Sequence, residues 1–291
     1  MSRPELSAAE HVPIRSVPEV IAALERFDVD LAVVPIENSI EGSVNVTLDT
    51  LGFGAEELMI QGEIVLGIQL HLAVQRGTQL SEIKTVVSHP HANAQCREWL
   101  AAKLPGVEIV AANSTAEAAQ AMARSRTKTN RATITNALAA QLYGLEIIAS
   151  DIEDHPENQT RFVILGRGVP ARTGHDKTSI VVFQSADRPG SLLGILQEFA
   201  ARAVNLTKLE SRPTKRGLGH YCFFIDAEGH LGDELVADVL RNLAAKHTVR
   251  FLGSYPVATS PGAEARRKAA GKAWKSAGIW LDQLRAQVRP E

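Results

Sequence analysis

Runs of β-branched and other apolar residues alternate with helical stretches along the first part of the chain, and this alternation constrains the fold more than any other feature. The runs include residues 31–34, 85–87 and 147–148, and the helical stretches include residues 90–104 and 115–126. Strands that alternate with helices are typical of βαβ units. The sequence therefore predicts an α/β fold.

A segment with glycine, proline and charge interrupts this alternation, as a linker does. The elements predicted beyond it are a strand at 178–183, a helix opened by residues 187–190, strands at 205–211 and 221–226, a helix at 233–246 and a strand at 249–252. This βαββαβ order is that of a ferredoxin-like domain. The predicted parts are a first domain at 1–168, a linker at 169–176, a second domain at 177–257 and a tail at 258–291.

The tail is rich in alanine, lysine and arginine, and its apolar residues fall on one face of a helix. We expect a basic amphipathic helix that packs against a domain or another subunit rather than against a membrane surface. The apolar residues on that face are Trp274, Ala277, Leu281, Leu284 and Val288.

Composition excludes several classes of protein. With 45% hydrophobic and 22% charged residues among 291, the chain is globular, and its net charge of -2 gives no footprint for nucleic acid. No apolar run approaches the roughly 20 residues of a spanning helix, and the start is polar, so we expect a cytoplasmic protein without membrane contact. Cys96 and Cys222 lie far apart, outside any zinc-binding set, and are predicted to be buried thiols.

Polar clusters lie beside the predicted strands at four places, which are residues 36–44, 88–96, 113–116 and 158–162. In an open α/β sheet, ligands gather at strand ends and where the chain crosses between lobes, so these side chains are expected to converge on a cleft. The alternative for each cluster alone is structural, because asparagine, serine and threonine also cap helices and turns.

In their order along the chain, the clusters resemble the motifs of prephenate dehydratase, a family of phenylalanine biosynthesis. The second domain resembles an ACT regulatory domain. The resemblance implies a two-lobed catalytic domain, like that of type 2 periplasmic binding proteins, followed by a ferredoxin-like ACT domain. The matching blocks are residues 35–39 with 42–44, 88–90 with 95–96, 113–116 and 160–162, and in the second domain 189–193 and 210–213.

The start of the chain departs from the family pattern. Members normally open with a strand, a Gly-Pro-x-Gly-Thr-Phe loop and a helix, whereas the first glycine here is Gly42. We expect residues 12–14 to form the family's second strand. We also expect translation to begin upstream of Met1, because an unfilled sheet position exposes backbone groups that need partners. The alternative is a truncated or catalytically silent protein that senses aromatic amino acids.

The resemblance implies that prephenate loses its ring carboxylate and ring hydroxyl to give phenylpyruvate, without a metal or cofactor. Thr160 would donate a hydrogen bond to the departing hydroxyl, and loss of such a donor costs about 10²–10³ in rate. Asn38 and Gln95 would assist or orient the ring. Glu37 would act as an acid only if burial raises its pKa. Arogenate remains the alternative substrate.

Anionic substrate groups would meet helix N-termini after Ser88 and Asn113, which offer free amides. Arg161 has two alternative roles, which are a charge-assisted contact with the substrate and a structural ion pair. Phe162 is expected to form core or cleft wall. The Ser-His-Pro block favours a positioning role for His89, and no role matches His91. The remaining substrate-binding candidates are Ser39, Ser43, Ser114 and Thr115.

In ACT domains a small amino acid sits at the interface of two paired modules, beside the turn that opens the first helix. The resemblance therefore implies phenylalanine as effector and a homodimer or homotetramer. Gly190 permits close backbone approach, and leucines behind it would line an aromatic pocket. The alternative is a sheet that only dimerises. The candidate effector-binding residues are Gly190, Ser191, Leu192, Leu193, Asn205, Glu210, Ser211 and Arg212.

Overall fold

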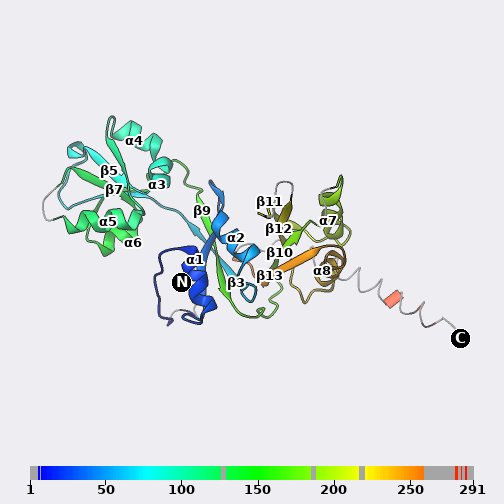
Figure 1. The fold of residues 1–291 in the computed structure, drawn as a ribbon. Coiled ribbons are helices and arrows are strands. Elements are labelled where there is room, and N and C mark those ends of the chain that lie inside the picture. The colour runs from blue at the N-terminus through cyan, green and yellow to red at the C-terminus, as the bar shows by residue number, and fades with distance from the viewer. Residues whose placement is uncertain are drawn as a thin grey trace. The chain divides into compact units, whose positions relative to one another are not determined.

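The computed structural model describes residues 6, 8–125, 129–184, 188–215 and 220–258, with positions 279, 280, 283 and 286 (Figure 1). Most of the predicted tail at 258–291 therefore lies outside the described residues. The chain divides into two compact units. The small unit consists of Asn38–Glu41 and Leu66–Thr160, and the large unit of Met1–Glu37, Gly42–Val65 and Arg161–Glu291. Among the described helices, none is long and apolar enough to cross a membrane.

The small unit is built on a five-stranded sheet. Its strands are β4 (His71–Val74), β5 (Thr85–Ser88), β6 (Glu108–Ala111), β7 (Arg131–Thr135) and β8 (Glu146–Ala149), and its helices are α3 (Pro90–Gln95), α4 (Arg97–Lys103), α5 (Thr115–Arg124) and α6 (Ala137–Leu142). The strand order is β6-β5-β7-β4-β8, with β5 parallel to β6 and β7, and β4 antiparallel to its neighbours. Leu72, Val86 and Ile134 are completely buried in its core.

The helix predicted at 90–104 is two helices, because the backbone leaves helical geometry at Cys96 (φ −117°, ψ 17°). The carboxylate of Asp154 caps the second helix by accepting from the backbone N–H groups of Glu98 at 3.0 Å and Trp99 at 3.1 Å. A negative charge is favourable at a helix start. The break is thus set by a residue more than 50 positions away, which no local pattern indicates.

Cys96 and Cys222 are free and buried, which confirms the prediction of buried thiols. Burial raises the pKa of Cys96 to about 12 and that of Cys222 to about 11. Neither thiol is therefore a nucleophile near neutral pH.

The large unit begins with a four-stranded sheet. Its strands are β1 (Ala32–Asn38), β2 (Gly42–Ser43), β3 (Met59–Gly67) and β9 (Gln159–Gly166), in the order β2-β1-β9-β3, and its helices are α1 (Val17–Glu25) and α2 (Asn45–Phe53). The expected strand at residues 12–14 is wrong, since these residues have no regular structure. Pro13 lacks the N–H that a sheet ladder needs. The Ser16 side chain instead starts α1 by accepting from the Glu19 N–H.

The C-terminal domain confirms the predicted βαββαβ order. Its elements are β10 (Asp176–Phe183), α7 (Ser191–Ala200), β11 (Leu206–Pro213), β12 (Tyr221–Glu228), α8 (Glu234–Lys246) and β13 (Thr248–Pro256). The strands form an antiparallel sheet in the order β11-β12-β10-β13. Figure 1 shows α7 and α8 beside this sheet, and buried residues of both helices share one core with one face of it.

The opposite face of the C-terminal sheet packs against the first sheet of the large unit. Successive side chains of β12 point to opposite faces. Phe223 and Ile225 lie in the core with α7 and α8, whereas Phe224 lies in a second core with Leu51 and Ile60. Contact is so close at Gly52 that a Cβ there would meet the Phe224 ring at 2.5 Å. The C-terminal domain is therefore joined to β1, β3 and β9 by a continuous core.

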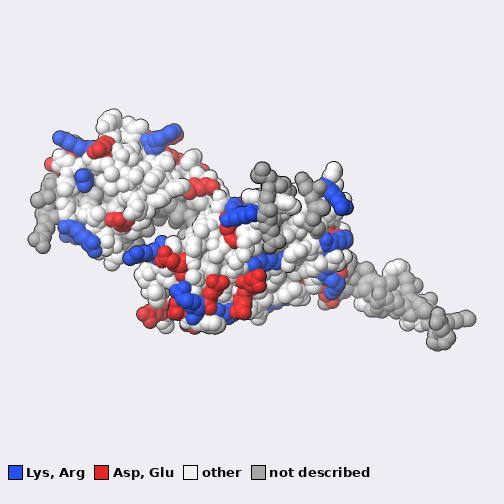
Figure 2. Space-filling model, in the orientation of Figure 1, with Lys and Arg blue, Asp and Glu red and all other residues white. Residues whose placement is uncertain are grey.

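On the face that Figure 2 shows, lysine and arginine alternate with aspartate and glutamate over the described residues, without a large patch of one sign. This pattern agrees with the net charge of -2.

Candidate active site

The last residue of β1, Asn38, has a side-chain amide of fixed orientation. Its Oδ1 accepts hydrogen bonds from the backbone N–H groups of Ile40 at 2.9 Å and Glu41 at 3.0 Å. A backbone N–H can only donate, so the oxygen must face these groups and the Nδ2 group must face the other way. The turn after β1 thus leaves the Nδ2 donors of Asn38 for its other neighbours.

Asn38 Nδ2 donates to Thr160 Oγ1 at 2.9 Å and to Asn158 Oδ1 at 2.8 Å. Thr160 is therefore an acceptor in this contact, and its own hydroxyl hydrogen stays available. Among the hydrogen bonds of the described residues, none uses that hydrogen. Thr160 is buried, with 9% of its surface exposed. Thr160 can therefore donate a hydrogen bond to a bound molecule.

The polar contacts continue from Asn158 toward α3. Asn158 Nδ2 donates to Gln95 Oε1 at 3.1 Å, and Gln95 Nε2 donates to Glu41 Oε1 at 3.2 Å. The same Glu41 oxygen lies 2.5 Å from His91 Nδ1. We call this series of residues the polar chain, and all of it belongs to the small unit. Its members are His91, Glu41, Gln95, Asn158, Asn38 and Thr160.

Other candidates of the small unit have structural contacts. Ser88 Oγ is buried and donates to the Ile134 carbonyl at 2.6 Å, and Ser114 caps α5 by accepting from the Glu117 N–H at 3.0 Å. Ser39 accepts from the Gln159 N–H at 2.9 Å, beside the polar chain. Asn113 donates to the Glu117 side chain at 3.2 Å. His89 caps α3, and Thr115 is the first residue of α5.

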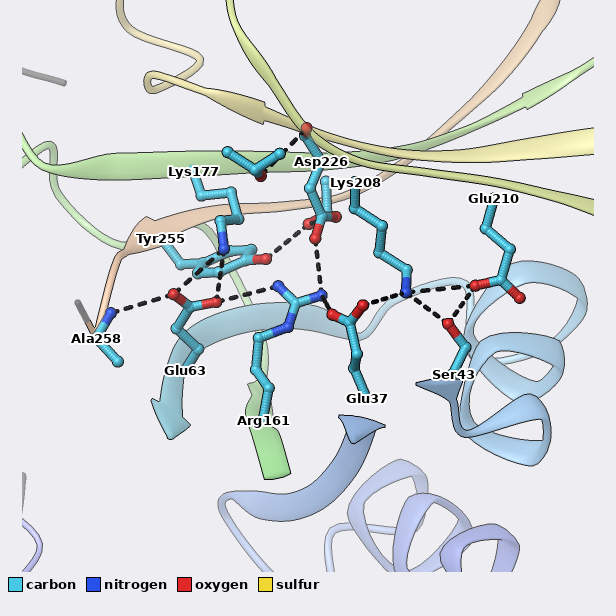
Figure 3. Close-up of polar contacts among 12 residues, drawn as sticks. Glu37, Ser43, Glu63, Arg161, Lys177, Lys208, Glu210, Asp226, Tyr255 and Ala258 are labelled. Atoms are coloured by element: carbon cyan, nitrogen blue, oxygen red, sulfur yellow. Dashed lines mark hydrogen bonds and ion pairs between the residues drawn. The ribbon is translucent and has the colours of Figure 1, made fainter. Parts of the chain in front are cut away.

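Arg161 takes part in ion pairs, which is the second of its two predicted roles. Its Nη2 donates to Asp226 at 2.8 Å, its Nη1 donates to Glu63 at 3.1 Å, and Glu37 lies 3.2 Å from Nη2 (Figure 3). Lys177 adds a second cation 3.0 Å from Glu63. Arg161 is thus held by acidic residues of β1, β3 and β12.

Glu37 and Ser43 belong to the same cluster. Lys208 of β11 donates to Glu37 at 3.1 Å and to Ser43 Oγ at 2.5 Å, and Ser43 also donates to Glu210 (Figure 3). Glu37 therefore has two cationic ion-pair partners, Arg161 and Lys208. Phe162 is half-buried.

Electrostatics keeps the pair of Arg161 and Asp226 charged. Burial acts to lower the pKa of Arg161, but Asp226 and then Tyr255 and Glu63 outweigh it and raise that pKa above its ordinary value. Burial acts to raise the pKa of Asp226, but Arg161 and Lys177 outweigh it and lower that pKa. Both partners are therefore ionised near neutral pH.

A cavity of about 490 Å³ lies in the C-terminal domain beside the start of α7. Gly190, whose φ of +85° is accessible to glycine, opens α7 at its edge. Ser211 of β11 lines the cavity, whereas Glu210 and Arg212 do not, because alternate side chains of a strand face opposite ways. Asn205 is also outside the lining. The lining residues are Gln184, Arg188, Gly190, Ser191, Leu192, Leu193, Leu196, Ser211, Tyr221 and Phe223.

Asn158, Glu41 and His91 belong to the polar clusters of the sequence, but sequence reasoning gave none of them an individual role. Asn158 is 1% exposed in the structure. The sequence signal that could have indicated its role is its position at the start of the polar cluster at 158–162, directly before a strand. Glu41 lies in the turn after Asn38, and His91 lies one helical turn before Gln95. The four-residue spacing on α3 places His91 and Gln95 on one face of the helix, but no local sequence pattern indicates that either contacts Glu41. Among the described residues, no group of three histidine, cysteine or acidic side chains could hold a metal ion.

Comparison with known proteins places the chain in a family. The family model described as prephenate dehydratase matches residues 4–169, and that of the ACT domain matches residues 178–245. The prephenate dehydratase of Mycolicibacterium vanbaalenii is 44% identical over 97% of this chain and 89% of its own length.

Solved structures agree in fold. Prephenate dehydratase from Arthrobacter aurescens in complex with L-Phe is 40% identical, with a TM-score of 0.87 over 97% of this chain and 93% of that one. GqqA, described as a quorum quenching acylase, is 29% identical, with a TM-score of 0.74 over 86% and 89% of the two chains. The chain therefore belongs to the prephenate dehydratase family and carries a C-terminal ACT domain.

Proposed function

We propose that the chain converts prephenate into phenylpyruvate, with the Thr160 hydroxyl as hydrogen-bond donor to the departing ring hydroxyl. The observation that supports this role is the contact in which Asn38 Nδ2 donates to Thr160 Oγ1 at 2.9 Å. Since Thr160 accepts there, its hydrogen is left for the substrate. A donor fixed before the reaction stabilises charge that develops in the transition state.

The chemistry needs little from the protein besides orientation and hydrogen bonds. The C–C bond to the ring carboxylate breaks, its electron pair enters the ring, and carbon dioxide leaves. The C–O bond to the ring hydroxyl breaks, and hydroxide leaves with the electron pair of that C–O bond and becomes water on taking up a proton from solvent. A threonine hydroxyl is too weak an acid to transfer its proton unaided, so Thr160 acts as a hydrogen-bond donor. Formation of the aromatic ring drives the reaction.

Phenylpyruvate absorbs strongly in alkali, which makes the test direct. We expect Thr160→Ala to keep the fold and lower kcat by at least about a hundredfold, and Thr160→Ser to retain part of the activity. Thr50→Ala is the matched control, because Thr50 Oγ1 donates to the Val46 carbonyl of its own helix. Near-normal turnover by Thr160→Ala contradicts the assignment. Arogenate in place of prephenate, with the same chain, decides between the two substrates.

We further propose that the cavity beside α7 binds phenylalanine as a feedback inhibitor. The positive end of the α7 dipole suits a carboxylate, and Leu192, Leu193 and Phe223 suit an aromatic ring. The relative from Arthrobacter aurescens was solved with L-Phe. Calorimetry with phenylalanine tests this role, and an absence of binding heat together with undiminished turnover contradicts it.

Strand β11 offers a route from this cavity to the catalytic domain. Ser211 lines the cavity, while Lys208 on the opposite face of the strand donates to Glu37. Glu37 directly precedes Asn38 of the polar chain. Phenylalanine inhibits by this route only if it binds the two states of the protein unequally. We propose that it favours the less active one.

Apolar residues exposed on the C-terminal domain suggest how two copies pair. Leu193, Leu209 and Tyr221 are 58%, 44% and 42% exposed, and two of them line the cavity. We propose that this surface pairs with a second copy in a cytoplasmic homodimer or homotetramer. Light scattering after size exclusion gives the mass, and Leu209→Glu is expected to dissociate the pair.

A further inference from the structure

Glu41 is a carboxylate of the polar chain that the reaction described above does not use. It lies in the turn between β1 and β2, and its Oε1 contacts both Gln95 Nε2 at 3.2 Å and His91 Nδ1 at 2.5 Å. The His91 ring is itself positioned, because it stacks on His89 with ring centroids 5.0 Å apart and planes 10° apart.

The hydrogen-bond directions make Glu41 an orienting group. A side-chain amide has two orientations of nearly equal shape, and they exchange donor for acceptor. An ionised carboxylate can only accept, so Glu41 holds the Gln95 Nε2 group toward itself. Gln95 Oε1 then faces the Asn158 Nδ2 donor at 3.1 Å. In the reverse orientation, the Gln95 NH₂ group would face the Asn158 NH₂ group.

We propose that Glu41 and His91 are positioning residues that hold the Gln95 amide in the orientation the reaction needs. Gln95 Nε2 has two hydrogens, of which one binds Glu41 and the second remains for the substrate. His91 fixes Glu41, and Glu41 fixes Gln95. This inference rests on the proposed dehydratase function and adds two residues to its site.

The contacts of this pair serve orientation more than stability. The side chains of His91 and Glu41 are 61% and 39% exposed, and exposed ion pairs contribute little to folding. Substitution is therefore expected to leave the melting temperature unchanged while it changes turnover.

The test measures kcat, KM and the melting temperature of Glu41→Ala. We expect kcat to fall about tenfold, the effect of one lost charged hydrogen bond, with KM and melting temperature unchanged. Glu41→Gln keeps an acceptor oxygen and is expected to recover part of the rate. Glu157→Ala is the matched control, because Glu157 pairs with His155 on the same unit and is 72% exposed.

A double-variant cycle separates positioning from an independent role. If Glu41 acts through Gln95, then Glu41→Ala with Gln95→Ala has the same kcat as Gln95→Ala alone. Glu41→Ala with wild-type kcat, or losses in the double variant that multiply, overturn the proposal while the dehydratase function stands. Absence of turnover in the wild-type chain overturns the proposed function and this inference together.

Discussion

Arg161 Nη2 donates to Asp226 Oδ2 over 2.8 Å, which joins strand β9 of the catalytic domain to strand β12 of the ACT domain (Figure 3). Arg161 directly follows Thr160, just as Glu37 directly precedes Asn38. The ACT domain therefore binds the chain neighbours of both residues that make the central contact of the polar chain. Substitutions in this ion-pair cluster can therefore test both the stability of the fold and its regulation by phenylalanine.

Replacement of Arg161 by methionine is expected to destabilise the fold, because it leaves Asp226 and Glu63 with one cation fewer in a buried place. Removal of one partner of a buried pair costs about 3–5 kcal/mol. The double variant Arg161→Met with Asp226→Asn removes the unpaired charge as well and is expected to recover part of that loss. Urea unfolding at pH 7 measures both. A double variant no more stable than Arg161→Met shows that Asp226 is not the partner that matters.

The same pair predicts how stability depends on pH. The pKa of Asp226 is lowered in the folded protein, because Arg161 and Lys177 outweigh burial. Its contribution is thus fully present above the unfolded pKa of about 3.9 and is lost as the pH falls through the lower folded pKa. We expect the stability difference between the wild type and Asp226→Asn to be constant from pH 5 to 8, within ~0.5 kcal/mol, and to shrink in stronger acid. Urea midpoints across that range measure it, and a difference that grows in acid contradicts the sign.

Substitution of Lys208 is expected to distinguish the binding of phenylalanine from the inhibition that follows it. Lys208→Met removes the contacts with Glu37 and Ser43 but leaves the residues that line the cavity unchanged. Phenylalanine is expected to bind with its usual heat while it inhibits less. Lys246→Met is the matched control, because Lys246 at the end of α8 pairs with Glu198 of α7 at 2.5 Å. Full inhibition of Lys208→Met at equal occupancy excludes this route.

The sequence predicted the order of the ACT elements and the residue types of the site, but not the partners of those residues. Local turn and periodicity signals define βαββαβ, whereas the contact of Arg161 with Asp226 joins positions 65 apart. Along a strand, successive side chains point to opposite faces of the sheet, so two neighbouring residues have different partners. Ser211 lines the cavity and Arg212 binds Asp49 at 2.7 Å, although both belonged to one predicted effector site. Which residues of a strand face the cavity depends on the register of that strand, and the surrounding sheet sets this register.

Asn158 provides a test of the polar chain at a residue that sequence reasoning left without a role. It is 1% exposed, accepts from Asn38 and donates to Gln95. Asn158→Asp keeps the acceptor but replaces the donor by a second oxygen, which would face Gln95 Oε1. We therefore expect kcat to fall at least about tenfold.

The matched control for this change is Asn136→Asp. Asn136 caps α6 with its oxygen, which accepts from the Ala139 N–H at 2.8 Å, and a carboxylate serves equally well at that position. The control is expected to keep wild-type kcat and stability. Equal activity of Asn158→Asp and Asn136→Asp in the phenylpyruvate assay shows that the direction of the hydrogen bonds in the polar chain does not affect the reaction. A selective loss at Asn158, with the melting temperature retained, supports the order in which Glu41, Gln95, Asn158 and Asn38 orient the Thr160 hydroxyl.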